Sequence, residues 1–243
     1  MRITKLAAAF ASVAMMTQVY GANVSSISRI EFGPDSVLFV ADWKASRVEA
    51  IQLPSALSAT ASPYNIDDLT VLLSKAVGGA AVQIADMKVR PGTGLVYVAY
   101  EFGQYGTPAL AEITSQGSVR NIDLNSARAT EVTLKNATTA NVAFSGKIPE
   151  RSMTVTDMKW NGSELFVAGL SNRSFTSSLW RVRYPFDGSS SLTSVEIYHT
   201  AHNQIETRAP IRAMAFANLN GASYLVAESI RLPPINSMTS QHK

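Results

Sequence analysis

The sequence lacks cysteine and is poor in histidine and in charged residues. Its 243 residues include no cysteine, three histidines and 16% charged residues. The absence of cysteine excludes disulfides and thiolate chemistry, and it carries no information about the cellular compartment. No run of Lys and Arg is longer than two residues, and no basic patch is interleaved with aromatic residues. The chain is therefore not predicted to bind nucleic acid.

The sequence also lacks the short motifs of common catalytic sites. It contains no Gly-x-Ser-x-Gly, no glycine-rich phosphate loop and no dinucleotide-binding fingerprint. Its hydrophobic fraction of 46% is that of a globular protein with a substantial core. We therefore predict no cofactor, and a protein that is not an enzyme is favoured over an enzyme.

The N-terminus has the features of a secretory signal peptide. Arg2 and Lys5 give a positive start, an apolar stretch runs from Leu6 to Met16, and Val19 and Gly21 are small residues before a cleavage point. About 11 apolar residues are too few to span a bilayer, which needs about 20. We expect a leader over residues 1–21 and a periplasmic or secreted chain from Ala22, with no membrane span after cleavage.

One strand–turn–strand pattern occurs four times. The clearest copy is Val155-Thr-Asp-Met-Lys-Trp160 followed by Leu165-Phe-Val-Ala168, and the other copies begin at Ile27, Ile84 and Ile211. The copies start 57, 71 and 56 residues apart. Solenoid repeats are usually about 20–45 residues long, whereas four-stranded propeller blades reach about 40–50 and more with insertions. The spacing therefore predicts an all-β fold of β-propeller-type repeats.

The pattern assigns about three and a half blades to a domain over residues 22–230, with an irregular tail over 231–243. Blade one spans 27–53, a short helix lies near 66–77 with Asn65 as its cap, and blade four covers 211–229. The strands of blade two are expected near 84–90, 95–100, 109–114 and 119–124, and those of blade three near 153–160, 164–170, 179–184 and 194–198. Between them, β-tendency at 131–134 and 142–144 suggests an extra hairpin.

A half-blade leaves a sheet edge without a partner, and propellers avoid such edges by closing. Three explanations stay open. The chain is a truncated copy of a longer protein, its two terminal segments share a blade, or two chains close on each other by self-association through the open edge.

Several segments resemble a known group of proteins. Leu38-Phe-Val-Ala-Asp42, Asp86-Met-Lys-Val-Arg-Pro91 and Leu165-Phe-Val-Ala-Gly-Leu-Ser-Asn172 resemble exported bacterial β-propellers of the YVTN/NHL-like, quinoprotein-dehydrogenase-like superfamily. More narrowly, Ser194-Val-Glu-Ile-Tyr-His-Thr-Ala-His202 is similar to one uncharacterised exported family within it. The resemblance spans about 27–228 and implies a propeller fold. It implies no particular activity.

Asp86 and Asp157 occupy the same position of the repeat. One interpretation is a ring of carboxylates that binds a cation near the propeller axis. The other is that each carboxylate accepts backbone N–H groups and holds neighbouring blades together. Arg29 and Ala213 stand at this position in the other two copies. A metal site would not tolerate that exchange, so the second interpretation is favoured.

Three further groups are weaker candidates. His199, His202 and Glu206 are spaced on a loop, but not as in the helical zinc motif, and no metal is predicted there. Arg208 and Arg212 are expected at a channel mouth, where they bind an anion or pair with Asp157 or Glu206. Trp43 and Glu101 follow second strands and are expected in loops at the blade edges, Trp43 as a packing residue.

These observations favour an exported, non-catalytic β-propeller that binds an unknown ligand or protein partner through its loop face. One alternative is a metal- or quinone-dependent propeller enzyme, similar to a lactonase or a dehydrogenase, which would need several ligands converging at the axis. The other is a fragment without independent function.

Overall fold

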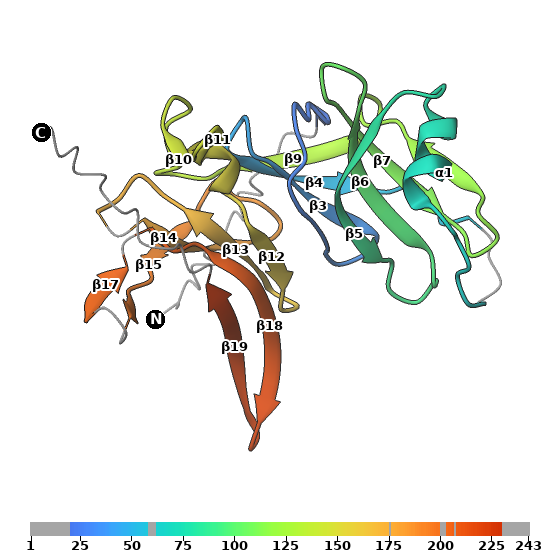
Figure 1. Ribbon diagram of the computed structural model, residues 1–243. Coiled ribbons are helices and arrows are strands. Elements are labelled where there is room, and N and C mark those ends of the chain that lie inside the picture. Colours follow the sequence, from blue (N-terminus) through green and yellow to red (C-terminus); the bar gives the residue numbers. More distant parts are fainter. Residues whose placement is uncertain (1–19, 58–61, 175, 200–202, 207, 230–243) are drawn as a thin grey trace, which may run out of the picture.

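The computed structural model describes residues 20–57, 62–174, 176–199, 203–206 and 208–229. Strands dominate, and the exceptions are helix α1 (Leu69–Ala76) and a 3-10 turn, η1 (Glu150–Met153). The predicted all-β fold with propeller-type blades is confirmed. Figure 1 shows the sheets arranged as an open fan, and the described strands do not close into a ring. The predicted tail and residues 1–19 of the predicted leader lie outside the described residues.

Blades two and three are four-stranded antiparallel sheets whose strands are in sequence order. Blade two consists of β5 (Val82–Val89), β6 (Val96–Phe102), β7 (Thr107–Ile113) and β8 (Val119–Ile122). Blade three consists of β12 (Asp157–Trp160), β13 (Glu164–Leu170), β14 (Ser177–Arg183) and β15 (Ser191–Ser194). The expected last strand of blade three was misplaced, because Tyr198 lies in a separate hairpin of β16 (Ile197–His199) and β17 (Gln204–Glu206).

Blade one takes its outermost strand from much later in the chain. It contains β2 (Ile30–Phe32), β3 (Val37–Asp42), β4 (Arg47–Gln52), β9 (Arg128–Thr133) and the short β1 (Tyr20–Gly21). Val132 of β9 pairs with Val48 of β4. The extra hairpin expected from 131–134 and 142–144 is therefore wrong. β9 protects the edge of β4, and β10 (Ala143–Ser145) pairs with β11 (Ile148–Pro149) instead.

The fourth repeat is a two-stranded hairpin of β18 (Ile211–Leu219) and β19 (Ala222–Ser229). It extends away from the other sheets in Figure 1. We refer to it as blade four, and the expected count of about three and a half blades is confirmed.

The blades do not follow each other in space as they do in sequence. The inner strand of blade one, β2, lies beside both β5 of blade two and β12 of blade three, and β12 also lies beside β18. Along the fan the order is therefore blade two, blade one, blade three, blade four (Figure 1). Blade one thus lies between blades two and three, and we call it the central blade. In the sequence, blade two and its helix are inserted between β4 and β9.

Helix α1 begins one turn later than the sequence suggested. Asp68, not Asn65, is its cap, and its side chain accepts the N–H of Val71 at 3.0 Å. Leu73 is buried against Val98 and Tyr100 of blade two. The helix therefore packs on blade two on the side away from blade one, where it lies beside both the inner strand β5 and the outer strand β8. Among the described helices, none is long and apolar enough to cross a membrane.

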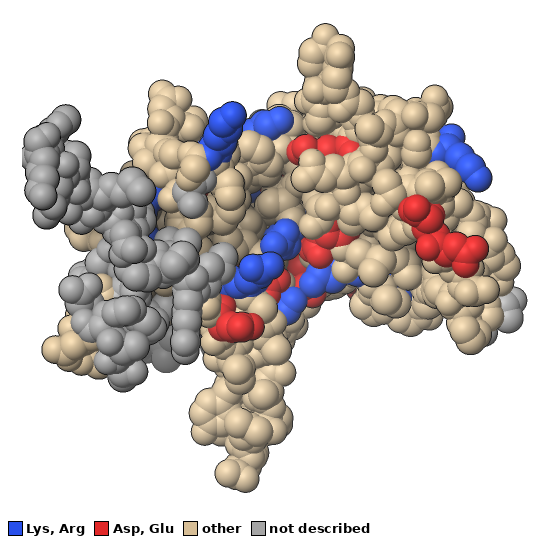
Figure 2. Space-filling view, in the orientation of Figure 1, with Lys and Arg blue, Asp and Glu red and all other residues tan. Residues whose placement is uncertain are grey.

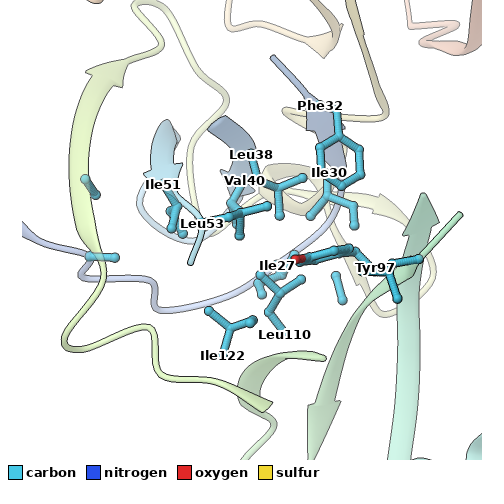
Figure 3. Packing of buried hydrophobic residues seen from close by; sticks show 14 residues of the cluster. Ile27, Ile30, Phe32, Leu38, Val40, Ile51, Leu53, Tyr97, Leu110 and Ile122 are labelled. Carbon is cyan, nitrogen blue, oxygen red and sulfur yellow. The ribbon is translucent and has the colours of Figure 1, made fainter. Parts of the chain in front are cut away.

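Apolar side chains fill the spaces between blades. Figure 3 shows Ile30 and Val40 of blade one opposite Tyr97 and Leu110 of blade two. On the other side of blade one, Phe39 packs among aromatic rings of blade three, on β12 and on the connection between β14 and β15. The core is therefore a series of layers between successive sheets, as expected for propeller blades.

Candidate functional site

The repeat position that holds Asp86 and Asp157 forms the joints between blades. Asp86 Oδ2 accepts the N–H of Ile30 at 2.9 Å, and Asp157 Oδ2 accepts the N–H of Met214 at 2.6 Å. In each case the other carboxylate oxygen accepts the N–H of the next residue in its own strand. These are the interblade hydrogen bonds expected for the two side chains.

Arg29 stands at the same repeat position in blade one, and it donates hydrogen bonds where the two aspartates accept them. Its Nε donates to the carbonyl of Thr156 at 2.6 Å, and its Nη1 lies 3.5 Å from the carbonyl of Ala85. These carbonyls belong to the residues just before Asp157 and Asp86. One guanidinium in the central blade therefore bonds to the inner-strand starts of both neighbouring blades.

A second set of charged residues lies two positions after Arg29, Asp86 and Asp157, and its sign alternates from one blade to the next. Glu31 of the central blade lies 3.2 Å from Lys88 of blade two and 3.7 Å from Lys159 of blade three. Burial raises the pKa of the Glu31 carboxyl, and the two ammonium groups oppose that rise. Figure 2 shows acidic and basic side chains gathered in the middle of the face. The blades are thus joined by charges of alternating sign.

A cavity of about 280 Å³ opens where the inner strands begin. We call this side of the fan the loop face, because β3 and β6 also end there. The cavity lies between blades one, two and three, and the side chains and backbone that carry polar groups come from all three. The polar and aromatic residues that line it include Ser28, Arg29, Trp43, Gln83, Glu101 and Thr156.

Two polar atoms at this cavity are buried without a hydrogen-bond partner in the described part of the chain. They are Oε1 of Glu101 and Oγ of Ser28. A buried carboxylate oxygen without a donor is costly, typically about 1–3 kcal/mol or more for a charged group. Trp43 is half-buried beside them. The cavity therefore combines an aromatic side chain with an acceptor that has no donor.

Trp43 and Glu101 were expected only as loop residues, and their common position was overlooked. Each comes two residues after the alanine that ends the Phe-Val-Ala or Tyr-Val-Ala part of its repeat, Ala41 or Ala99. Equivalent positions of neighbouring blades face the same mouth. The repeat alignment alone was thus sufficient to bring these two residues together. No comparable signal identifies Ser28.

The candidate group of His199, His202 and Glu206 falls largely outside the described residues. His199 pairs with Gln204 in the β16–β17 ladder, and Glu206 pairs with Ile197. The side chains of these two candidates, and the whole of His202, lie outside the described residues. Where side chains are described, no group of three or more His, Asp or Glu residues is arranged to hold a metal ion.

Arg208 has a structural partner that the sequence did not indicate. Its Nη2 donates to Glu150 Oε1 at 2.8 Å and to the carbonyl of Ala143 at 3.2 Å, and its guanidinium lies over the ring of Phe144. The expected pairing with Asp157 is wrong, because that carboxylate is occupied by backbone N–H groups. Arg212 is exposed on β18, and neither arginine lines the cavity.

A separate buried network joins blade two to the segment after blade one. Glu112 is fully buried and accepts bonds from Tyr97, from Arg120 at 2.8 Å and from the N–H of Leu57 at 3.1 Å. Burial, together with the neighbouring Glu112 carboxylate, raises the pKa of Tyr97 to about 12. Every partner in this network is internal, so it stabilises the joint and offers no binding surface.

Comparison with known proteins assigns no family. No protein-family model matches the chain, and no curated protein is detectably similar to it. The function is therefore inferred from the geometry of the loop face.

Proposed function

We propose that this chain is an exported, non-catalytic propeller-type protein that binds a ligand in the loop-face cavity. The observation that carries the proposal is Glu101, which lines a cavity shared by three blades and whose buried Oε1 has no donor within the described residues. A buried acceptor of this kind is satisfied when a ligand supplies the donor. Ligand pockets typically measure about 300–1,000 Å³, so this cavity suits a small molecule or the end of a peptide.

The groups at the cavity favour a ligand that carries both charges. Glu101 suits a protonated amine through a charge-assisted hydrogen bond. The ring of Trp43 has the Lys44 ammonium group over it at 5.5 Å, and it offers a ligand amine a cation–π contact when that group is displaced. Arg29 uses Nε and Nη1 for backbone carbonyls and has no bond from Nη2 among the described residues. Its remaining N–H groups suit a carboxylate. An amino acid or a short peptide has both groups, so we propose this class of ligand.

The geometry offers less support for a propeller enzyme. Asp86 and Asp157, the carboxylates that a metal site at the axis would need, are occupied by interblade hydrogen bonds. A lactonase-like mechanism requires several carboxylates or amides around one ion. The binding proposal uses Glu101 Oε1 and Nη2 of Arg29, which have no partner among the described residues, whereas the enzyme alternative requires carboxylates whose oxygens already accept interblade bonds.

The proposal is tested by thermal unfolding of the chain with panels of free amino acids, dipeptides, simple amines and simple carboxylates. At 100 times its dissociation constant, a ligand stabilises the folded state by about 2.7 kcal/mol, which raises Tm by roughly 5–10 °C for a chain of this size. We expect this shift with amino acids or dipeptides, and a smaller one with ligands that have only one of the two charges.

Two variants and one control make the test specific. Glu101→Gln and Trp43→Ala remove the carboxylate and the ring, and both should abolish the shift while the protein still unfolds cooperatively. Tyr105→Ala is the matched control, because Tyr105 is 84% exposed in the loop that follows β6 and does not line the cavity. If no compound of the panel raises Tm, or if Glu101→Gln retains the full shift, the proposed ligand site is wrong.

A further inference from the structure

Each inner strand carries the same apolar face. A neighbouring blade covers this face in three blades, whereas in blade two helix α1 covers only part of it. The fourth repeat position is Ile30 in blade one, Met158 in blade three and Met214 in blade four, with exposures of 0%, 0% and 4%. In blade two the equivalent Met87 is 52% exposed and Val89, on the same face, is 60% exposed. Helix α1 packs on this side of the blade, with Leu73 against Val98 and Tyr100, but leaves Met87 and Val89 on the inner strand exposed.

The three covered joints show what this face packs against. Ile30 packs against blade two, Met158 packs against blade one, and Met214 packs against blade three. The apolar face of an inner strand therefore always meets the back of another blade. By the back we mean the side of a sheet that is turned away from its own fourth-position residue.

The other end of the fan has a bare back. In the β18–β19 hairpin, Phe216 and its cross-strand neighbour Leu225 face blade three, and Phe216 stacks on Phe166 at 5.4 Å. The opposite side carries Val226 and Leu219, which are 53% and 55% exposed. Within the described residues this is the back that no other blade covers. Blade four and blade two lie at opposite ends of the fan, so the two surfaces of one copy do not meet (Figure 1).

We propose that two copies of this chain associate head to tail, with the exposed part of the apolar face of blade two in one copy packed on the back of blade four in the other. The occupant of each surface is thus a second copy, because the chain itself carries both halves of the joint that it uses three times internally. The proposal is independent of the ligand proposed above.

Such an arrangement closes after two copies. Each copy contributes four inner strands, so the pair forms a ring of eight, within the range of about 4–8 blades that propellers adopt. Both joints of the ring are identical under a two-fold axis, and a head-to-tail contact that closes gives a finite assembly. Closure also covers the apolar residues at both ends, which a lone copy leaves in water.

The test is the mass of the purified chain in solution, measured by light scattering during size-exclusion chromatography. The wild-type chain should be a dimer that dissociates on dilution. Met87→Glu and Val226→Lys, each at one end of the fan, should both be monomers. Ile148→Glu is the matched control, because Ile148 is an apolar residue of the β10–β11 hairpin with a similar exposure of 46%, and it should remain a dimer.

Mixing the two monomeric variants distinguishes head-to-tail contact from other dimers. A mixed pair regains one wild-type joint, and at the other joint it brings the introduced carboxylate of one variant toward the introduced ammonium group of the other. The mixture should therefore form dimers that neither variant forms alone. Circular dichroism and cooperative unfolding of each variant exclude misfolding as the cause of a monomer.

Two results would overturn the proposal. The first is a wild-type chain that stays monomeric at high concentration. The second is a Met87→Glu chain that still dimerises, since that result indicates pairing of β19 edges.

Discussion

At the scale of single residues, the charged positions of the repeat serve assembly of the fold. Asp86 and Asp157 bond to backbone N–H groups of the next blade, and Arg29 bonds to backbone carbonyls on both sides. The sequence predicted the role of the two aspartates because their repeat position tolerates arginine and alanine. It did not predict that Arg29 performs the same task with the opposite polarity, since this depends on which blades are neighbours.

The hydrogen bonds that Asp157 accepts make a measurable contribution to the free energy of unfolding. Asp157→Ala leaves the buried N–H groups of Met158 and Met214 without their acceptor, and an unsatisfied buried donor costs about 1–3 kcal/mol. We expect urea denaturation to show a loss of unfolding free energy in this range. Asp67→Ala is the control, because Asp67 is exposed near the start of α1, and its loss should stay within about 0.5 kcal/mol. Equal effects of the two substitutions would contradict the role given to Asp157.

At the scale of strands and hairpins, local patterns predicted what is local. Alternating burial and turn residues such as Asn161-Gly162 identified the hairpins of blades two and three close to their observed bounds. The pairing of β9 with β4 was not predictable in this way. About 80 residues separate Val48 from Val132, and β9 has an alternation that fits any half-buried edge strand. The sequence identified the strand but not its partner.

Substitution of Gly169 tests how closely strand β13 packs against the backbone beside it. A Cβ atom at this position in β13 would lie 1.9 Å from the carbonyl oxygen of Thr154, so only glycine permits the close approach of that backbone. We expect Gly169→Ala to lower the unfolding free energy by about 3 kcal/mol. Gly103→Ala is the comparison, because Gly103 has φ of 71° but open space around it, and backbone strain alone should cost about 1 kcal/mol. Thermal or urea unfolding measures both losses, and a larger loss for Gly103→Ala would contradict the steric argument.

At the scale of the whole molecule, the order of the blades is the feature that sequence reasoning missed most clearly. Four repeats in sequence suggest four blades in the same order, yet the first repeat lies between the second and the third. All three of these blades line the cavity for the same reason, because blade one contributes Trp43 and Arg29, blade two Glu101 and blade three Thr156. A signal was nevertheless present. Glu31 stands where Lys88 and Lys159 stand in the adjacent copies, so the central blade carries the opposite charge.

Glu31 is therefore expected to stabilise this blade order. Its carboxylate is the shared partner of two lysines from different blades, and all three side chains are at most 24% exposed. Glu31→Gln keeps the shape but removes the carboxylate that the two ammonium groups share, and Lys159 keeps only Asp157 at 3.5 Å. Urea denaturation should therefore show a loss of about 1–3 kcal/mol, larger at low salt than at high salt. Arg181→Gln is the matched control. It breaks the Glu164 pair, in which Arg181 is 50% exposed, and pairs of that kind contribute about 0–1 kcal/mol. If both substitutions cost the same, the charges between blades contribute no more than ordinary surface pairs, and blade order must come from apolar packing alone.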